Sequence, residues 1–426
     1  MGIPRFSISR GAGSRLLRST LAVLIALPGV PAFAQLLPAE RQVLIDLYNS
    51  TNGPGWIDRT GWAAPGPDCG AFGVGCNAAG TNVTSIQLYQ NGLSGSLPAL
   101  GALSQLRILA LSGNQLSGPI PDLSGLSQLA SVELDINQFT GSLPALAGLD
   151  NLLFFGAAHN QLTGSIPPLT GLVNLQSFAV GYNELSGTLP SLSGLNALLY
   201  FDASSNQLTG TLPTLAGLSN LENFSVGDNQ LSGTIPPLTG LAAIRRLDFS
   251  RNLLTGPLPS FQGLSQLEAF SAAHNALTGP IPSLAGSPLL RSLNLGTNLL
   301  SGTLPEFSSF PNLNVVGLSN NQFSGGIPAL TGLAELNTFQ VANNRLTGPL
   351  PALTGLSSLV VFTVGINQLS GPLPEPPSPS ALAPGGSNLC PNAFPSTTFV
   401  SHPAWDVATA SNPWFRSCVI FFDGFE

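Results

Sequence analysis

The sequence predicts a solenoid, a stack of short coils held together by parallel β-strands, and three observations lead to this fold. An asparagine recurs every 23 residues, in 13 copies from Asn91 to Asn367. Every copy is followed three residues later by Ser or Thr, then by Gly, and seven residues later by Pro. Only 8% of the 426 residues are charged, while 48 are glycine and 37 are proline. A fixed period of this length is typical of architectures in which neighbouring units bury one another.

The first segment, residues 1–34, has the pattern of a secretory signal peptide. Arginines precede a short apolar run at residues 21–27, and residues 32–34 read Ala-Phe-Ala, a small-residue cleavage pattern. The apolar run is too short to span a bilayer, which takes about 20 helical residues. We therefore expect an exported chain that starts near Gln35 with a net charge of −11. An uncleaved membrane anchor is the alternative.

Residues 35–82 are expected to form a cap, because the end coil of a stack would otherwise expose its core. Val43, Leu44 and Leu47 recur at helical spacing, which predicts a short amphipathic helix. Trp56 and Trp62 follow and supply large apolar side chains.

Within each unit of residues 83–374, the positions five and three before the asparagine are apolar in all copies. Their alternation with polar or small neighbours predicts a short strand with one buried face. Large and small residues balance within a unit, as in Phe201 with Ala203. The asparagine amide can both donate and accept hydrogen bonds where the chain turns. The glycine permits a positive φ, and the proline fixes φ without leaving an N–H unpaired.

This unit resembles the leucine-rich repeat family, and its Leu-[Ser/Thr]-Gly-x-[Ile/Leu]-Pro segment resembles the plant extracellular subtype. The resemblance implies an α/β solenoid: a curved, right-handed coil with a parallel β-sheet on its concave face, here with 13 repeats of 23 residues. It also implies a recognition role. Cys69 and Cys76, with Gly73 and Val74 between them, resemble the N-terminal cap of that family, although Ala71 replaces its tryptophan.

Residues 375–426 are expected to form a Pro-rich break followed by a C-terminal cap and tail. Cys390 and Cys418 lie here, so an exported chain has four cysteines and three formal ways to pair them. We favour Cys69–Cys76 and Cys390–Cys418, because thirteen coils at about 4.8 Å each separate the two caps by roughly 60 Å. The same separation excludes a zinc site built from all four cysteines, because the cysteines of the two caps lie too far apart to bind one ion.

The composition also bears on the source of the chain. All 13 basic residues are arginine and none is lysine, which is typical of a GC-rich genome. The last five residues, Phe-Asp-Gly-Phe-Glu, resemble short tails on exported bacterial proteins. We therefore predict a secreted bacterial member of the family, located outside the cell, in the periplasm or at the cell surface.

Several functional classes are disfavoured by the sequence. Nucleic-acid binding lacks its basic patch, since the net charge is −7. His159 and His274 lie five coils apart, about 24 Å, which is too far for a shared metal. The glycine-rich segments lack the Gly-Lys-[Ser/Thr] of a phosphate loop. We expect no enzyme, no metal, no cofactor and no membrane span in the mature chain; the sequence leaves the oligomeric state open.

Residues that face the ligand in such a solenoid lie six, four and two before each asparagine, with the preceding residue at the edge. Most of these positions carry small or polar residues, but larger and charged ones gather on four successive coils. These candidate ligand-binding residues are Tyr182, Tyr200, Asp202, Asp228, Arg246, Asp248 and Arg251. A second group, nearer the N-terminus, comprises Tyr89, Glu133, Asp135 and Phe154. The alternative is a solvated face with surface pairs such as Arg246 with Asp248, which contribute little.

Three functions remain open at this point. The leading prediction is a secreted recognition module that binds a protein, peptide or glycan on the concave face. The second is a structural or adhesive spacer at a cell surface, favoured by the few charges on that face. The third is binding of ice or a crystalline polysaccharide through the ladder of Ser and Thr hydroxyls, against which stands their ordinary role in turns.

Overall fold

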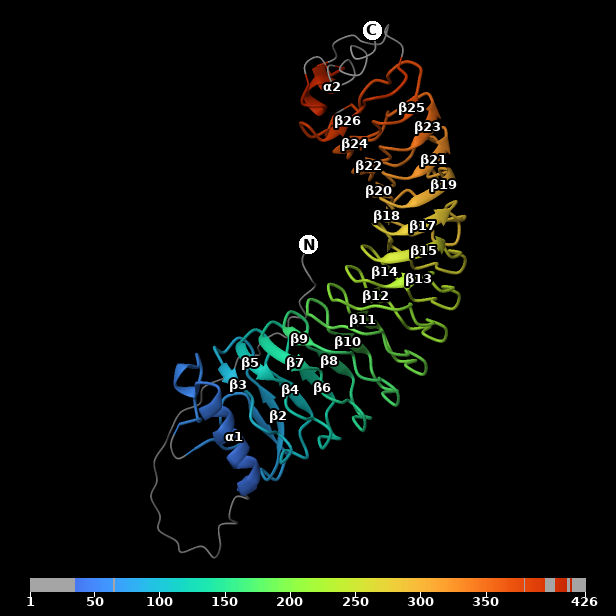
Figure 1. Ribbon diagram of the computed structural model, residues 1–426. Helices are drawn as coiled ribbons and strands as arrows, with labels where there is room; N and C mark the ends of the chain where they lie inside the picture. The colour runs from blue at the N-terminus through green and yellow to red at the C-terminus, as the bar shows by residue number, and fades with distance from the viewer. Residues whose placement is uncertain (1–34, 64–65, 379, 395–402, 412–413, 416–426) are drawn as a thin grey trace, which may run out of the picture.

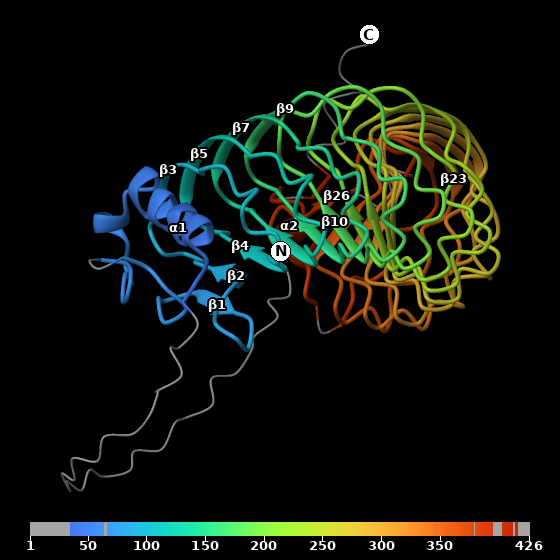
Figure 2. The ribbon, with the colours of Figure 1, turned by 90° about the horizontal axis from the view of Figure 1, so that it is seen from below.

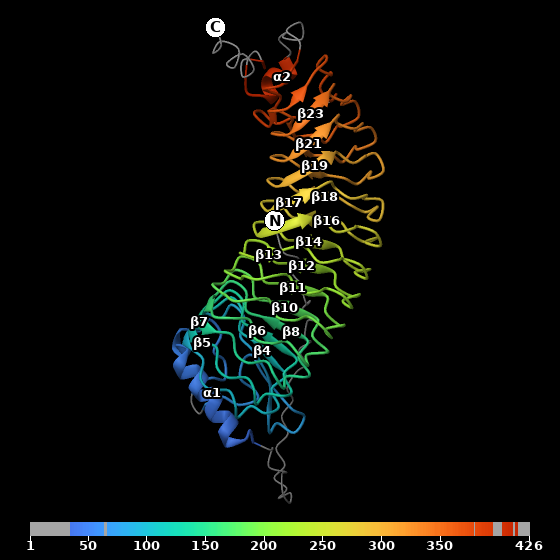
Figure 3. The same cartoon turned by 45° about the vertical axis from the view of Figure 1, so that its right-hand side comes forward.

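The computed structural model describes residues 35–63, 66–378, 380–394, 403–411 and 414–415. Its coils stack into a curved and twisted β-solenoid, with the N-terminal cap at one end and the C-terminal cap at the other (Figures 1 and 3). The proposed signal peptide and Cys418 lie outside the described residues, so the export signal and the Cys390–Cys418 pairing stay predictions.

The main sheet contributes one short strand from each coil and lies on the inner side of the curve (Figure 1). All of its strand pairs are parallel except β1 with β2. The strands from β2 to β24 keep the 23-residue register, as in Phe178, Phe201 and Phe224, whereas β24 pairs with β26 at an offset of 25 residues. Its strands, in order, are β1 (Val74–Cys76), β2 (Val83–Gln87), β4 (Ile108–Ala110), β6 (Ser131–Glu133), β8 (Phe154–Gly156), β10 (Ser177–Ala179), β11 (Tyr200–Asp202), β12 (Asn223–Ser225), β14 (Arg246–Asp248), β16 (Ala269–Ser271), β18 (Ser292–Asn294), β20 (Val315–Gly317), β22 (Thr338–Gln340), β24 (Val361–Thr363) and β26 (Ser387–Asn388).

A second set of parallel strands runs along the side of the solenoid (Figure 2). The Gly and Pro in these segments had predicted turns there instead of strands. The segments after most of the repeat asparagines form these strands, with a leucine or phenylalanine buried and the following Ser or Thr more exposed. One sheet comprises β3 (Ser94–Ser96), β5 (Gln115–Pro119), β7 (Gln138–Ser142) and β9 (Gln161–Thr163); the other comprises β13 (Ser232–Gly233), β15 (Leu253–Pro257), β17 (Ala276–Gly279), β19 (Leu299–Thr303), β21 (Gln322–Gly325), β23 (Arg345–Gly348) and β25 (Gln368–Leu369). Single bridges such as Thr188 with Thr209 connect the coils between them.

The core is a continuous column of apolar side chains between these two surfaces. The strand positions predicted to be buried are buried, and the phenylalanines of β8, β10, β11 and β12 stack on one another with ring centroids 5.3–5.6 Å apart. Along the rest of each coil, leucines point inward while the chain makes turns. Within the described repeats the returning segments contain no helix, so the helices of the described chain belong to the caps.

The repeated asparagine connects its own coil to the preceding coil through its side chain. Asn206 Oδ1 accepts a hydrogen bond from the Leu185 N–H at 2.9 Å, and its Nδ2 donates to the Val180 carbonyl at 3.1 Å. The same pattern recurs along the stack and satisfies backbone groups that no strand reaches. Asn392 takes this role after the last repeat, with 2.9 Å from the Leu369 N–H to its Oδ1, although it lies 25 residues after Asn367.

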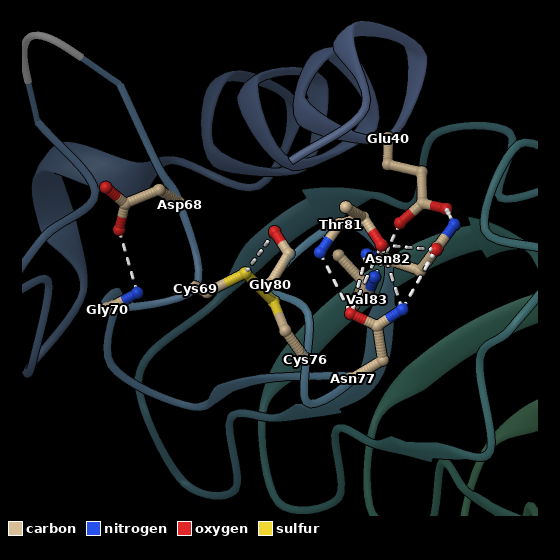
Figure 4. Close-up of a disulfide and its surroundings, with 10 residues drawn as sticks. All are labelled: Glu40, Asp68, Cys69, Gly70, Cys76, Asn77, Gly80, Thr81, Asn82 and Val83. Atoms are coloured by element: carbon tan, nitrogen blue, oxygen red, sulfur yellow. Dashed lines mark hydrogen bonds between the residues drawn. A yellow bond between two sulfur atoms is a disulfide. The ribbon is translucent and has the colours of Figure 1, made fainter. Parts of the chain in front are cut away.

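The N-terminal cap has the predicted helix, α1 (Pro38–Ser50), followed by a 3-10 turn, η1 (Gly53–Gly55). Val43, Leu44 and Leu47 are buried as predicted. Glu40 is buried too, because its carboxylate accepts hydrogen bonds from the Asn82 amide at 2.6 Å and the Val83 N–H at 2.5 Å (Figure 4). The predicted Cys69–Cys76 disulfide is present beside this contact.

The C-terminal cap covers the other end of the core with α2 (Pro403–Ala408). Trp405 is fully buried against Phe362, with ring centroids 6.1 Å apart, and donates from its indole to the Pro374 carbonyl at 3.2 Å. The described residues of this segment thus cover the apolar core at this end of the stack.

Candidate functional site on the inner sheet

Most strands of the inner sheet bury their middle residue, and in β11 and β14 the residues on either side of it face outward. In β11 the pattern is clear: Phe201 is buried, whereas Tyr200 is 37% exposed and Asp202 is half-buried. The same holds in β14, where Leu247 is buried between Arg246 and Asp248. The residues that share one repeat position on successive coils form a column along the solenoid. The columns six and four residues before the asparagine, which were predicted to face a ligand, are therefore solvent-facing at these two strands.

The tyrosine and aspartate of β11 form one hydrogen-bonded unit. The Tyr200 hydroxyl donates to Asp202 Oδ2 at 3.3 Å, while Asp202 Oδ1 accepts from the Ser204 N–H at 2.9 Å and the Ser204 hydroxyl at 2.7 Å. Partial burial raises the pKa of the Tyr200 phenol, and the negative charge of Asp202 raises it further. Tyr200 is therefore a neutral phenol whose ring faces solvent and whose hydroxyl is held in place.

Asp248 repeats this arrangement two coils further along. Its Oδ1 accepts from the Ser250 N–H at 2.9 Å and from the Ser250 hydroxyl at 2.6 Å. The surface pair of Arg246 with Asp248 is absent: the ion pairs in the described part of the chain join Arg245 to Glu222 at 3.9 Å and to Glu268 at 2.7 Å. Arg246 and Arg251 are both exposed and neither has an acidic partner there. We call these two residues the arginine pair.

The other predicted residues lie at the edge of the sheet, where the chain turns. Tyr182, Asp228 and Arg251 each precede a repeat asparagine and have positive φ angles of 57°, 59° and 51°. Tyr182 is 53% exposed, and its ring stacks on the imidazole of His159 with centroids 4.2 Å apart. Asp228 accepts a long hydrogen bond from the Ser205 hydroxyl at 3.4 Å.

The second predicted group is also assembled on the inner sheet. The Tyr89 hydroxyl donates to Glu133 Oε2 at 3.3 Å, and the Ser131 hydroxyl donates to Glu133 Oε1 at 2.8 Å. Burial, followed by the charge of Glu133, raises the pKa of Tyr89 to about 12. Phe154 projects from β8 and is 43% exposed.

Asp135 is the most buried carboxylate of this group. Its Oδ1 accepts from the Ala158 N–H at 2.9 Å, and its Oδ2 accepts from the Ser112 hydroxyl at 3.4 Å. Burial nevertheless raises the pKa of Asp135, and the nearby charge of Glu133 acts in the same direction, against the lowering effect of the hydrogen bonds.

Two further residues, which the sequence did not assign to a site, lie between the two groups at the edge of the sheet. Ile136 and His159 occupy the edge position on the two coils before Tyr182, and Ile136 is 60% exposed with a φ of 56°. The sequence did contain a signal for Ile136. The position before the repeat asparagine takes a left-handed conformation, and isoleucine is rarely found in that region. We call the following residues of the inner sheet and its edge the aromatic–acidic surface: Tyr89, Glu133, Asp135, Ile136, Phe154, His159, Tyr182, Tyr200 and Asp202.

This surface presents exposed or half-buried aromatic rings and carboxylates that can contact a ligand. In the part of the chain that the structure describes, no three His, Cys, Asp or Glu side chains are grouped to hold a metal ion. His159 stacks on a tyrosine and does not contact a nucleophile. A search of the described residues also finds no helix with the length and apolarity needed to cross a bilayer.

Comparison with known proteins adds family information. A family model described as Leucine Rich Repeat matches residues 105–126. No curated protein matches the sequence significantly.

Solved structures are similar over most of the chain. A plant peptide hormone receptor, RGFR1 in complex with RGF2, is 31% identical with a TM-score of 0.67 over 72% of this chain and 54% of its own. This chain therefore spans about half the length of that receptor structure. A leucine-rich repeat protein of Leptospira interrogans, LIC12759, is 26% identical with a TM-score of 0.55 over 72% of this chain and 78% of its own. A plant ice-binding protein is 25% identical with a TM-score of 0.50 over 74% of this chain and 90% of its own.

Proposed function

Because this chain is a leucine-rich repeat protein, we propose that it is a non-enzymatic recognition module that binds a peptide or protein segment on its inner sheet. The observation that carries the proposal is the distribution of side chains on that sheet. Exposed aromatic rings, carboxylates and the arginine pair gather on the coils between Tyr89 and Arg251, whereas most other outward positions are small or polar. Tyrosine and arginine are enriched among the residues that dominate binding energies.

Two further observations support this function. One of the similar structures is that of a plant peptide hormone receptor in complex with RGF2. The Cys69–Cys76 disulfide agrees with an oxidising compartment outside the cytosol, so we propose an extracellular, cell-surface or periplasmic location. The bacterial source is likewise a prediction, and the similarity to a Leptospira protein agrees with it.

The test is capture of partners from host or environmental extract by the full chain and by a variant with Tyr200, Asp202, Arg246 and Asp248 all changed to alanine. We expect a stoichiometric partner with the native chain and its loss with the variant, whose circular dichroism should be unchanged. Equal capture by both proteins contradicts the inner-sheet site. Self-association alone, without a partner, supports the spacer function instead.

Ice binding is a second candidate, because one of the neighbouring structures is a plant ice-binding protein. The side sheets present the Ser and Thr ladder as an outward row. However, Thr209, Ser232 and Thr255 donate their hydroxyls to the carbonyls of Gly187, Gly210 and Gly233 at 3.2–3.3 Å. These hydroxyls already bond within the sheet, so we rank this function second. A thermal hysteresis measurement tests it directly, and zero hysteresis removes it.

A further inference from the structure

The outward residues of the inner sheet alternate in size with a period of two coils. In the column six residues before each asparagine, Phe154, Tyr200 and Arg246 lie on alternate strands. Ser177 pairs with both Phe154 and Tyr200, and Asn223 pairs with both Tyr200 and Arg246. The surface is therefore a series of ridges separated by one-coil gaps that hold a serine or an asparagine.

The spacing of these ridges selects among the regular peptide conformations. Strands about 4.8 Å apart place every second coil about 9.6 Å apart. A polyproline II helix makes one turn in three residues at about 3.1 Å each, or about 9.3 Å per turn. An extended strand repeats its side chains about every 6.7 Å, and an α-helix completes a turn in about 5.4 Å. Of these three conformations, only the polyproline II helix has an axial repeat that matches the ridge spacing over two successive gaps.

The chemistry of the ridges suits the same conformation. Proline-rich segments bind grooves lined by aromatic rings, and their backbone carbonyls have no internal hydrogen bonds. Phe154 and Tyr200 supply exposed rings, while the Asn223 amide and the Arg246 guanidinium are donors in or beside the second gap. A proline-rich segment is also ordered before it binds, which lowers the entropy cost of association.

Acidic side chains at one end of the site and the arginine pair at the other favour one orientation of a ligand along the solenoid. Glu133 and Asp135, with Asp202 three coils further along, have no basic group within ion-pair distance in the described chain. The arginine pair lies at the other end and has no acidic partner among the same residues, and Asp248 beside it bonds to Ser250. Five coils, about 24 Å, separate the coil of Glu133 from the coil of Arg246. That distance corresponds to about eight residues of polyproline II helix.

We propose that the inner sheet binds a proline-rich segment in the polyproline II conformation, lying along the solenoid axis across the strands. A basic residue of the segment contacts Glu133 and Asp135, and an acidic residue about eight positions away contacts the arginine pair. The proposal rests on the proposed recognition function and defines the ligand class for the same site.

The probe is a synthetic peptide with arginine and glutamate separated by seven prolines and with both ends blocked, titrated against the full chain by calorimetry. We expect binding that weakens as salt is added, because part of the attraction is electrostatic. Three matched peptides serve as controls: one with a Gly-Ser spacer of equal length, one with arginine at both ends and one with glutamate at both ends. Each should bind at least about tenfold more weakly.

The decisive variant is Arg246→Glu, with Arg345→Glu on the exposed side strand β23 as its matched control. Arg246→Glu should lose the Arg-Glu peptide by at least about tenfold and gain the Arg-Arg peptide, whereas Arg345→Glu should change neither. A charge exchange that transfers preference between peptides cannot result from misfolding.

Two sets of results overturn the proposal. One is equal binding of the Gly-Ser peptide, or no binding of the proline peptide at about 1 mM. The other is a lack of response to Arg246→Glu. If the alanine variant still loses a captured partner while the proline peptide fails, the recognition site stands and the ligand class is wrong. If the alanine variant also captures its partner normally, the recognition function fails as well.

Discussion

Asp202 and Asp248 each combine a structural contact with an exposed charge. Each carboxylate holds the N–H and hydroxyl of the serine two residues later, and each lies over a glycine of the preceding coil. A Cβ on Gly181 or Gly227 would lie 3.0 or 3.1 Å from the carboxylate oxygen of the neighbouring aspartate. The sequence predicted both aspartates as ligand-facing residues. It did not predict this contact, because the residues that make room lie on another coil.

We expect Ile136 to lower the stability of the fold while it contributes to ligand binding. A left-handed conformation costs an L-residue roughly 1–2 kcal/mol, and asparagine tolerates it. Asn320 and Asn343 occupy the equivalent position with φ angles of 60° and 55°. We expect Ile136→Asn to increase the free energy of unfolding by about 1 kcal/mol in denaturant titrations, and to weaken binding of the proline peptide several-fold.

Ile366 provides the matched control for this prediction. It has a φ of 57° and is 50% exposed, but it lies ten coils from Ile136. Ile366→Asn should stabilise the chain to a similar extent and leave peptide binding unchanged. Equal loss of binding in both variants would contradict a role for Ile136 in the site.

Asp135 should make the stability of the fold depend on pH in an unusual direction. Burial and the charge of Glu133 raise its pKa in the folded chain above the unfolded value. The protonated form is then favoured by folding, so this contribution is fully present below about pH 4 and is lost as pH rises through the folded pKa. Asp135→Asn should therefore raise the melting temperature at pH 7, and the gain should disappear near pH 3.5.

Asp122 offers the opposite case as a control. The N–H and the hydroxyl of Ser124 lower the pKa of this exposed carboxylate. Its contribution is present above the unfolded pKa and is lost as pH falls through the folded value. Asp122→Asn should thus lower the melting temperature slightly at pH 7. A gain at neutral pH in both variants would indicate a general effect of removing negative charge.

The elements of this fold exist only as neighbours in a stack. A three-residue strand such as β11 has no stability by itself, but it pairs with β10 and β12 through consecutive residues. The inner strands could be predicted because two apolar positions recur in every unit. The side strands could not, since Gln-Leu-Ser-Gly-Pro contains one buried residue together with a glycine and a proline, and this composition is typical of a turn. The segments form strands nevertheless, because they pair with the same segments of the neighbouring coils, and the sequence of a single unit does not show this pairing.

The repeated asparagines should contribute measurably to stability through their side-chain hydrogen bonds. Asn206→Ala leaves the N–H of Leu185 without its partner, whereas the Val180 carbonyl keeps its hydrogen bond from the Asn183 amide. An unsatisfied buried group costs about 1–3 kcal/mol, so we expect a loss of roughly 1–3 kcal/mol in denaturant unfolding. Hydrogen exchange should show the loss of protection on adjacent coils only, because repeats interact with nearest neighbours.

Asn220 is the control for the repeated asparagines, since it also donates to a carbonyl one coil away, that of Asn196 at 2.8 Å, but on an exposed turn. Asn220→Ala should cost less than about 0.5 kcal/mol. A comparable loss for both variants would contradict the special role assigned to the repeat position.

At the scale of the whole molecule, the distance between two residues along the solenoid axis is set by the number of repeats between them in the sequence. Every 23 residues add one coil, so the repeat alone determines which residues share a column. For that reason the sequence predicted the columns of the candidate site and the coils that carry it. It missed the ion pairs of Arg245, because that residue precedes the predicted column. It did not include Ile136 and His159 in the site, because the prediction at the edge position rested on tyrosine and charged residues.

This property permits a test of the ligand register by deletion of single coils. Removing residues 207–229 joins Asn206 to Gln230, preserves the repeat pattern, and moves Arg246 from two coils to one coil beyond Tyr200. Removing residues 322–344 joins Asn321 to Arg345 and shortens the stack equally, but outside the site. Solenoids tolerate the loss of one internal unit, so both proteins should melt within a few degrees of each other. Only the first deletion should weaken the proline peptide, by at least about tenfold, because the second ridge gap no longer matches a turn of the ligand. Retained affinity in the first deletion would mean that the ligand does not follow the two-coil spacing.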